Sequence, residues 1–539
     1  MQYQYIGTGI QSELDAISPE QAIAHLRNYL GNFLLDPAVT AAYINRLGNL
    51  PPETLTPQIQ AWLRYLLTKY AELLPFDEKA ATLMMNIMGG DPEKVRQLQK
   101  CRIPDAMARK VESLAQAPRD ERLRATLCAL LRDFRYSTEI AELLMSCDLA
   151  LGLPIGQDWL ETVALPPALR SLFVQRVCLN SIVLGHNARA LELLPKAAQT
   201  ESPHWLNHLA ELHVRTGETD KALGLYGRSL QLDPLQLPVQ HRMNALTSPE
   251  QDSPDALAGN IAIFLYSWNK AELLARTLQS LAATDTGNAH ITVLLNGCTD
   301  DSAARVAAIN EQLFGGRIEV ISLPINVGAP AARNWLLATD QGRTADYVAF
   351  LDDDVEVPPN WLRSMLSVLR RRPKAGVIGI KTLNPGLPKR LQYLYRNIAV
   401  AVPGLIRISF DTPNTNFDVG FYDVTRTTAN VMGCCHIFTR KAADAVPTFD
   451  LRFSPSQMDD IAHDLDVALA GFEVIFHGNV ECIHHQMSGV GRNQNGFDYA
   501  RFGNVAGNDV KFYYRFASRL DELHRLTNLD LIPETPPHC

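Results

Sequence analysis

The stretch Tyr347-Val-Ala-Phe-Leu-Asp-Asp-Asp354 decides how the second half of this 539-residue chain folds. An apolar run typical of a buried strand stops there at three consecutive carboxylates. Because side chains alternate along a strand, Asp352 and Asp354 would lie on the same side, where two like charges are costly unless a positive charge lies between them. A hard divalent cation shared with a phosphate would suit that place. Taken alone, the acids could equally form a solvated turn or a helix N-cap.

Strand-type and helix-type segments alternate around this stretch. The expected strands and helices are, in order, 260–265, 271–281, 291–295, 302–314, 318–322 and 331–338, followed by the strand that ends at Asp352. This alternation predicts a mostly parallel sheet covered by helices on both faces. In such sheets ligands bind beyond the carboxyl ends of the strands, which is where the three acids would lie.

The first half of the chain has a different pattern. Apolar residues recur at helical spacing, as in Trp62, Tyr65, Leu66 and Tyr70, and proline- or glycine-rich breaks separate the segments. We therefore expect residues 1–250 to be all helical.

Within it, the segment 170–236 resembles tetratricopeptide repeats, because Gly217 and Ala222 lie 32 positions after Gly185 and Ala190. Ordinary helical packing is the alternative. A true helical array would offer a groove for a protein partner.

The polar, proline-broken stretch Ser248–Asp255 predicts a linker at 251–259, with an α/β domain at 260–490 and a helical extension at 491–539. A formal charge of −8 argues against a nucleic-acid binder. The start has no basic segment with an apolar core, and no apolar run approaches the roughly 18 residues of a membrane span, so we expect a cytoplasmic protein without a transmembrane segment. Nine scattered cysteines are typical of reduced thiols.

Four segments of the α/β half, taken in order, resemble the family 2 glycosyltransferases, whose GT-A fold binds nucleotide sugars. The segments are Ile261–Leu274 with its Tyr-Ser-Trp-Asn, Leu295-Asn-Gly-Cys-Thr-Asp300, Asn326-Val-Gly-Ala-Pro-Ala-Ala-Arg-Asn334, and Phe350–Asp354 as the D-x-D signature. The resemblance covers roughly residues 260–490. It implies a nucleotide-sugar donor and a divalent metal bound through Asp352 and Asp354.

The resemblance also implies the residues of the donor site. These are Ser267, Trp268, Asn269, Asn296, Asp300, Arg333, Asp352 and Asp353. Trp268 would supply an aromatic wall for the base, and Arg333 could reach the diphosphate. Leu295 stands where the family usually has a base-reading aspartate, so selectivity for uridine does not follow.

A later segment, Phe449–Asp466, resembles the family's Glu-Asp pair at the start of an acceptor-side helix. This places Asp460 as the catalytic base, with Asp459 as the second candidate; a capping acid without chemistry is the alternative. In many relatives a histidine after a late strand completes the metal site, and His484 occupies that place. An imidazole ligand favours Mn2+ over Mg2+.

These features together predict an inverting glycosyltransferase whose helical half recruits a protein acceptor, with flagellin or another bacterial surface protein as one possibility. A lipid-linked or cell-surface glycan is the alternative acceptor. A non-catalytic interaction protein with a relic transferase domain is a further alternative, which the retained Asp352, Asp354, Asp460 and His484 disfavour.

Overall fold

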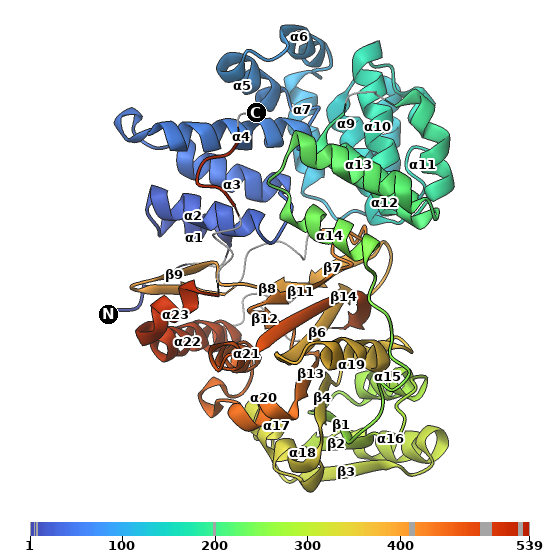
Figure 1. Cartoon of the computed structure of the whole chain (residues 1–539). Coiled ribbons are helices and arrows are strands. Elements are labelled where there is room, and N and C mark those ends of the chain that lie inside the picture. Colours follow the sequence, from blue (N-terminus) through green and yellow to red (C-terminus); the bar gives the residue numbers. More distant parts are fainter. Residues whose placement is uncertain are drawn as a thin grey trace.

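The computed structural model describes residues 2–4, 6, 9–197, 201–408, 416–485, 499–526 and 532–537. A helical part from the first half of the chain packs against an α/β part from the second half (Figure 1). The boundary predicted at residue 490 falls within 486–498, outside the described residues. None of the helices in the described ranges combines the length and the apolar character that crossing a bilayer requires.

The early helices of the helical part begin at short polar side chains. Ser18, Asp36 and Thr56 each accept a hydrogen bond from the backbone N–H three residues later, and a proline follows each of them. Such caps satisfy N–H groups that lack a partner in the first turn. The helices of this part are α1 (Ile10–Asp15), α2 (Pro19–Leu30), α3 (Pro37–Gly48), α4 (Pro57–Leu73), α5 (Glu78–Met88), α6 (Pro92–Lys100), α7 (Asp105–Ala115), α8 (Glu121–Asp133), α9 (Thr138–Ala150), α10 (Pro167–Val183), α11 (Asn187–Leu193), α12 (Pro203–Arg215), α13 (Thr219–Leu232) and α14 (Leu237–Thr247).

Two successive helix pairs, α10 with α11 and α12 with α13, carry the spaced small residues. Gly185 and Gly217 lie in the two turns, with φ angles of 76° and 79°. Ala190 and Ala222 are fully buried where the paired helices touch. This agrees with a helical-hairpin arrangement, and the assignment to tetratricopeptide repeats stays a prediction.

The α/β part is built on a ten-stranded sheet. Its strands are β1 (Ile261–Ser267), β2 (His290–Asn296), β3 (Ile318–Leu323), β4 (Tyr347–Asp352), β5 (Val355–Glu356), β6 (Ala375–Asn384), β7 (Arg390–Tyr393), β11 (Thr425–Thr428), β13 (Cys435–Thr439) and β14 (Glu473–His484). Their main order is β11-β14-β6-β13-β4-β1-β2-β3, and β4, β1, β2 and β3 are parallel. The sheet is mixed rather than mostly parallel, because β13 runs antiparallel to both β4 and β6.

Alternate residues of β1 belong to two different cores. Ile263 packs in a cluster with residues of α15 (Ala271–Ala282), α16 (Ser302–Ile309) and α19 (Trp361–Arg371). Phe264 belongs to a cluster on the other face, with residues of α17 (Ala329–Leu337) and of the N-terminal helices α1–α4. The first helices of the chain therefore share a hydrophobic core with the sheet. The remaining helices are α18 (Asp340–Thr344), α20 (Arg440–Ala445), α21 (Asp459–Leu469), α22 (Tyr499–Phe516) and α23 (Leu520–His524).

The segment between β6 and β13 contacts the helical part closely. It contains the short strands β8 (Tyr395–Arg396), β9 (Val400–Val402), β10 (Leu405–Arg407) and β12 (Asn430–Val431). The Phe33 ring stacks on Tyr395 with 5.1 Å between ring centroids, and the Asn32 side-chain oxygen accepts hydrogen bonds of 2.8 Å from both Asn397 and Arg426. These contacts are buried, so the segment is shaped by both parts of the chain.

The linker also lies along the α/β part. Arg363 donates to the carbonyl oxygens of Ser253 and Pro254, and Arg370 donates to the carbonyl oxygens of Ala256 and Ala258. Arg371, the last residue of α19, pairs with Glu250. Helix α19 therefore holds the linker at several points.

Candidate active site

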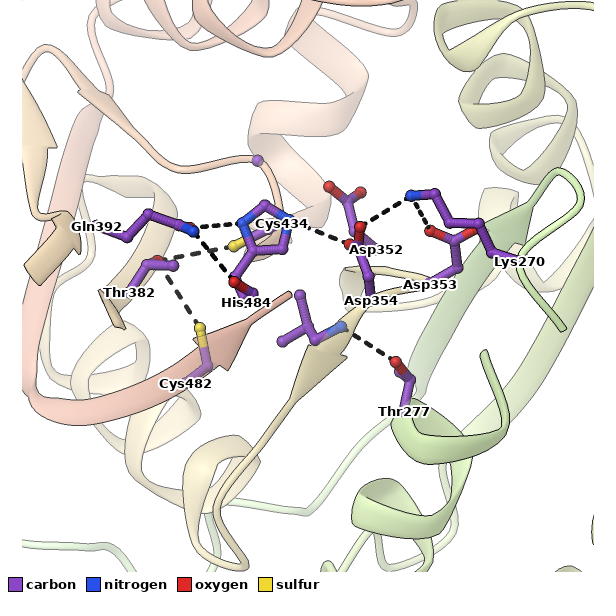
Figure 2. Close-up of polar contacts among 12 residues, drawn as sticks. Lys270, Thr277, Asp352, Asp353, Asp354, Thr382, Gln392, Cys434, Cys482 and His484 are labelled. Atoms are coloured by element: carbon purple, nitrogen blue, oxygen red, sulfur yellow. Dashed lines mark hydrogen bonds and ion pairs between the residues drawn. The ribbon is translucent and has the colours of Figure 1, made fainter. Parts of the chain in front are cut away.

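The carboxylates of the D-x-D motif lie at the end of β4, near the centre of the sheet. Asp352 accepts a hydrogen bond of 3.1 Å from the Tyr266 hydroxyl, because β1 and β4 pair these residues in register. Asp354 is buried and has two partners, the Lys270 Nζ at 2.8 Å and the His484 Nε2 at 3.1 Å. Figure 2 shows the Asp352, Asp354 and His484 side chains grouped at this edge.

His484 reaches the motif because β14 ends there. Its last residues pair antiparallel with β5, which follows the three aspartates directly, so that His484 stands opposite Val355. The backbone N–H of His485 also donates to the Asp354 carbonyl oxygen at 2.8 Å. Pairing between two distant segments therefore fixes the imidazole beside Asp354.

Asp352, Asp354 and His484 form a group that could hold a metal ion. One ligand atom from each residue lies within 4.8 Å of the others. Burial, with Asp354 nearby, raises the pKa of Asp352 to about 6. Burial alone would also raise the pKa of Asp354, but the hydrogen bond from His484 and the charge of Lys270 lower it below its ordinary value. Two carboxylates and one imidazole are a donor set that suits a divalent cation such as Mn2+.

The His484 ring is strongly affected by its neighbours. Burial disfavours its charged form, but the hydrogen bond to Asp354 and the carboxylates of Asp354 and Asp352 raise the pKa of His484 above its ordinary value. Positive charge on His484 and Lys270 therefore compensates the carboxylates, and a bound cation would take over that role.

Two loops after β1 and β2 contain the other residues expected at the donor site. Asn269 accepts a hydrogen bond of 2.7 Å from the backbone N–H of Thr299, which ties the two loops together. Asp300 accepts from the N–H of Ala271 at the start of α15. Trp268 is 53% exposed, so its ring is available for stacking.

Other residues of the predicted donor set are engaged inside the protein. Ser267 is buried and donates to Asp353 at 2.7 Å, and Asp353 also pairs with Lys270 at 2.9 Å. Asn296 is buried and holds the following loop, donating to Asn326 at 2.9 Å and accepting from the Val327 N–H at 2.9 Å. These side chains shape the loops around the acids.

The Arg333 side chain is buried and already paired, so it is not free to bind a diphosphate. Its guanidinium pairs with Asp459 and lies 3.5 Å from Asp352. It also lies over the Tyr266 and Phe449 rings, at 5.1 and 5.2 Å from their centroids. In this structure Arg333 joins the D-x-D edge to the start of α21.

Asp459 and Asp460 at that start differ in their surroundings. Asp459 is buried and paired with Arg333, and burial raises its pKa despite that partner. Asp460 is only partly buried and accepts a hydrogen bond of 3.2 Å from the Gly433 N–H. Of the two acids, Asp460 is the more accessible to a substrate.

The sequence interpretation missed two residues of this site. Lys270 bridges Asp353 and Asp354, and the only sequence signal was its place in the Tyr-Ser-Trp-Asn-Lys loop. Gln392 contacts the His484 ring at 2.7 Å from a segment that has no recognisable pattern. Figure 2 shows both side chains.

Residues 262–446 match the family model described as glycosyl transferase family 2. Together with a mixed sheet flanked by helices, the match defines the α/β part as a GT-A domain. Over residues 262–446 the chain is therefore similar to the family 2 glycosyltransferases.

Two curated proteins are similar to parts of the chain. The O-antigen biosynthesis protein RfbC of Myxococcus xanthus is 26% identical over 251 residues, which are 46% of this chain and 18% of that protein. The putative colanic acid biosynthesis glycosyl transferase WcaA of Escherichia coli K12 is 31% identical over 110 residues, which are 20% of this chain and 37% of that protein. The chain thus spans well under half of the length of either relative.

Solved structures of glycosyltransferases are also similar. The mannosyltransferase PcManGT of Pyrobaculum calidifontis, in complex with GDP-Man and Mn2+, has 18% identity and a TM-score of 0.37, over 57% of this chain and 82% of that one. GalNAc-T7 with UDP, GalNAc and Mn2+ has 14% identity and a TM-score of 0.34, over 42% of this chain and 44% of that one.

Proposed function

We propose that this chain transfers a sugar from a nucleotide-sugar donor to an acceptor in a single displacement that inverts the anomeric centre. The observation that carries the proposal is the cluster of Asp352, Asp354 and His484, which Arg333 links to the helix start at Asp459 and Asp460. Such a displacement requires residues that bind the donor and, in the same site, a carboxylate on the acceptor side.

On the donor side, Asp352, Asp354 and His484 would hold a divalent cation, and Mn2+ is the ion we propose. When bound, the cation neutralises the charge that grows on the departing diphosphate. The exposed ring of Trp268 would stack on the base of the nucleotide, with Asn269 beside it. Ser267, Asn296, Asp300 and Asp353 would hold the loops around the donor in place.

On the acceptor side, Asp460 would accept the proton of the attacking nucleophile. It is the less buried acid of the pair, and it lies in the first turn of α21. Asp459 would act through Arg333, because their ion pair fixes the position of the helix start.

For the acceptor we propose a protein, flagellin or another bacterial surface protein, recruited in the cytosol through the helical part. A second candidate is a surface or lipid-linked glycan, which the names of the relatives, O-antigen and colanic acid biosynthesis proteins, support. A contact within the chain also favours the glycan. Arg215 and Arg242, on α12 and α14 of the helical part, already bind the chain's own Val419 and Asp423 carbonyl oxygens, so they are not open to a protein acceptor.

A nucleotide-sugar panel tests the activity. Thermal shift of the purified chain with UDP-, GDP- and dTDP-sugars should reveal a donor that stabilises it only when Mn2+ is present. Mass spectrometry after incubation with that donor and a lysate, separated into protein and glycan fractions, then identifies the acceptor class. Absence of stabilisation by any nucleotide sugar with Mn2+ would count against the transferase proposal.

A further inference from the structure

Gln392 occupies an irregular position in the hairpin between β6 and β7. Tyr393 is paired with Thr382, and the next pair joins Leu391 to Leu383, so Gln392 is the extra residue of a β-bulge. Leu391 and Gln392 are both buried although they are consecutive. A regular strand would send one of them to the opposite face, whereas a bulge redirects a side chain, often beside an active site.

The contacts of the Gln392 amide fix its orientation. Its Nε2 donates to the Asn384 Oδ1 and to the His484 carbonyl oxygen, both at 3.1 Å. Both partners are acceptors, so the nitrogen must face them, and the Gln392 Oε1 therefore faces the His484 Nδ1 at 2.7 Å. Figure 2 shows the two contacts between Gln392 and His484. Since an amide oxygen can only accept, Nδ1 must carry a hydrogen.

This hydrogen bond decides which ring nitrogen can bind a cation. A neutral imidazole that is protonated at Nδ1 has its lone pair at Nε2, and the His484 Nε2 is the atom that faces Asp354 at 3.1 Å. We infer that Gln392 is a positioning residue that holds His484 in the tautomer and ring orientation needed to bind a divalent metal through Nε2. The inference rests on the proposed function, because it requires the Asp352, Asp354 and His484 metal site.

Gln392 would then influence which metal the site prefers. Mg2+ and Ca2+ are bound mainly by oxygen ligands, whereas imidazole adds affinity for Mn2+. Losing the hydrogen bond should weaken the imidazole ligand and leave the two carboxylates intact. The expected signature is a loss of Mn2+ affinity that exceeds the loss of Mg2+ affinity.

The test compares Gln392→Leu with the unaltered chain, using the metals alone. Titration with Mn2+, followed by the electron paramagnetic resonance signal of the free ion, should give an affinity about 10–100-fold weaker in the variant. Mg2+ affinity, measured by competition, should change much less. Ser364→Ala is the matched control, because it removes a 3.1 Å hydrogen bond from another buried histidine, His477, without touching the site.

Equal Mn2+ affinity in the two chains, or an equal loss for Mn2+ and Mg2+, would overturn the inference. If Gln392→Leu does not fold, Asn384→Ala replaces it, because that change removes one acceptor of the amide and should weaken Mn2+ binding by a smaller factor. A measurement without any variant uses the 15N resonances of the His484 ring with Cd2+ as a diamagnetic probe. They should show a hydrogen on Nδ1 and the metal on Nε2; the opposite arrangement would refute the role.

Failure of the proposed function gives a different result. If the unaltered chain binds no Mn2+, or if His484→Ala binds it as tightly as the unaltered chain, then the metal site itself is wrong. If the unaltered chain binds Mn2+ through His484 but Gln392→Leu binds it with the same affinity, the metal site is correct and the role of Gln392 is refuted.

Discussion

The guanidinium of Arg333 pairs with the carboxylate of Asp459, which lies 126 residues further along the chain. Both side chains are almost completely buried, so this pair forms in a setting where an unpartnered charge is costly. Arg333 also lies 3.5 Å from Asp352. One side chain therefore fixes the distance between the metal-binding edge and the helix that carries Asp460.

Asp354→Ala should abolish metal-dependent binding of nucleoside diphosphates. The change removes one of the two carboxylates of the metal cluster and leaves its neighbours in place. Calorimetry with UDP and GDP, with Mn2+ and with EDTA, measures the effect. Asp301→Ala, at an exposed acid of a neighbouring loop, is the control that should bind normally. An Asp354→Ala variant that binds as the unaltered chain does in Mn2+ contradicts the assignment.

Asp460→Asn should lower kcat by about 10²–10⁴ while donor binding survives, because the amide keeps the shape of the acid but cannot accept the proton. Initial rates with the donor found by the thermal-shift panel measure this, and NMR of the product gives its anomeric configuration. Asp444→Asn, at an exposed acid of α20, is the control. Near-normal turnover, or retention of the donor configuration, would reject Asp460 as the base.

Arg242→Ala should destabilise the chain by about 3–5 kcal/mol, because it leaves the buried Glu211 carboxylate without its positively charged partner. Arg242 binds Glu211 through two contacts, at 2.7 and 3.1 Å. Urea unfolding followed by circular dichroism gives the difference. The double variant Glu211→Gln with Arg242→Met removes both charges and should lose much less; equal losses in the two variants would show that the unpaired charge is not the cause.

The buried histidines should lower the stability of the chain as the pH decreases from about 6.5 towards 4. Burial lowers the pKa of His208, His241, His463 and His477 to about 4 from an ordinary 6.5. At these histidines the unfolded chain binds protons in this window that the folded chain excludes, which lowers the free energy of unfolding. Asp352, whose pKa burial raises to about 6, acts in the opposite direction. Urea unfolding at pH 7, 6 and 5 measures the slope.

His463→Phe should make that slope shallower. The His463 ring stacks on Phe449 with 4.2 Å between centroids and 16° between planes, so a phenyl ring fits there without a titrating group. An unchanged slope in this variant would mean that His463 does not contribute to the pH dependence.

A fragment of residues 256–539 should aggregate or unfold. Removing the helical part exposes Tyr395, Tyr422 and Arg426, which are buried against its first helices. Size-exclusion chromatography and thermal melting of this fragment test the expectation. Co-expression with residues 1–255 should restore a soluble complex. A monomeric fragment that melts at the temperature of the whole chain would disagree.

The elements before the three aspartates could be predicted because their signals are local. The strand expected at 291–295 is β2 (His290–Asn296), and the helix expected at 271–281 is α15 (Ala271–Ala282). Periodicity over a few residues is enough for such elements. The expectation of a mostly parallel sheet was wrong, because local periodicity does not give the direction of a strand, and β13 pairs antiparallel with both β4 and β6.

The sequence could predict the acidic residues of the candidate site, but it could not predict the residues that orient them. The acids follow strands or begin a helix, and their sequence motifs are continuous. Lys270 meets Asp354 across 84 positions, and Gln392 meets His484 across 92. Such contacts depend on a loop conformation and on a bulge that only the assembled fold creates.

Gly420 has a consequence for comparing this chain with others. Its φ is 110°, and a Cβ atom there would lie 2.6 Å from a carboxylate oxygen of Glu211, in α12 of the helical part. Any other residue would be strained at this φ and would push the Glu211 carboxylate away from its position beside Arg242. A related sequence that carries both parts but lacks glycine here would therefore need a different arrangement of the Glu211 and Arg242 side chains where the two parts meet.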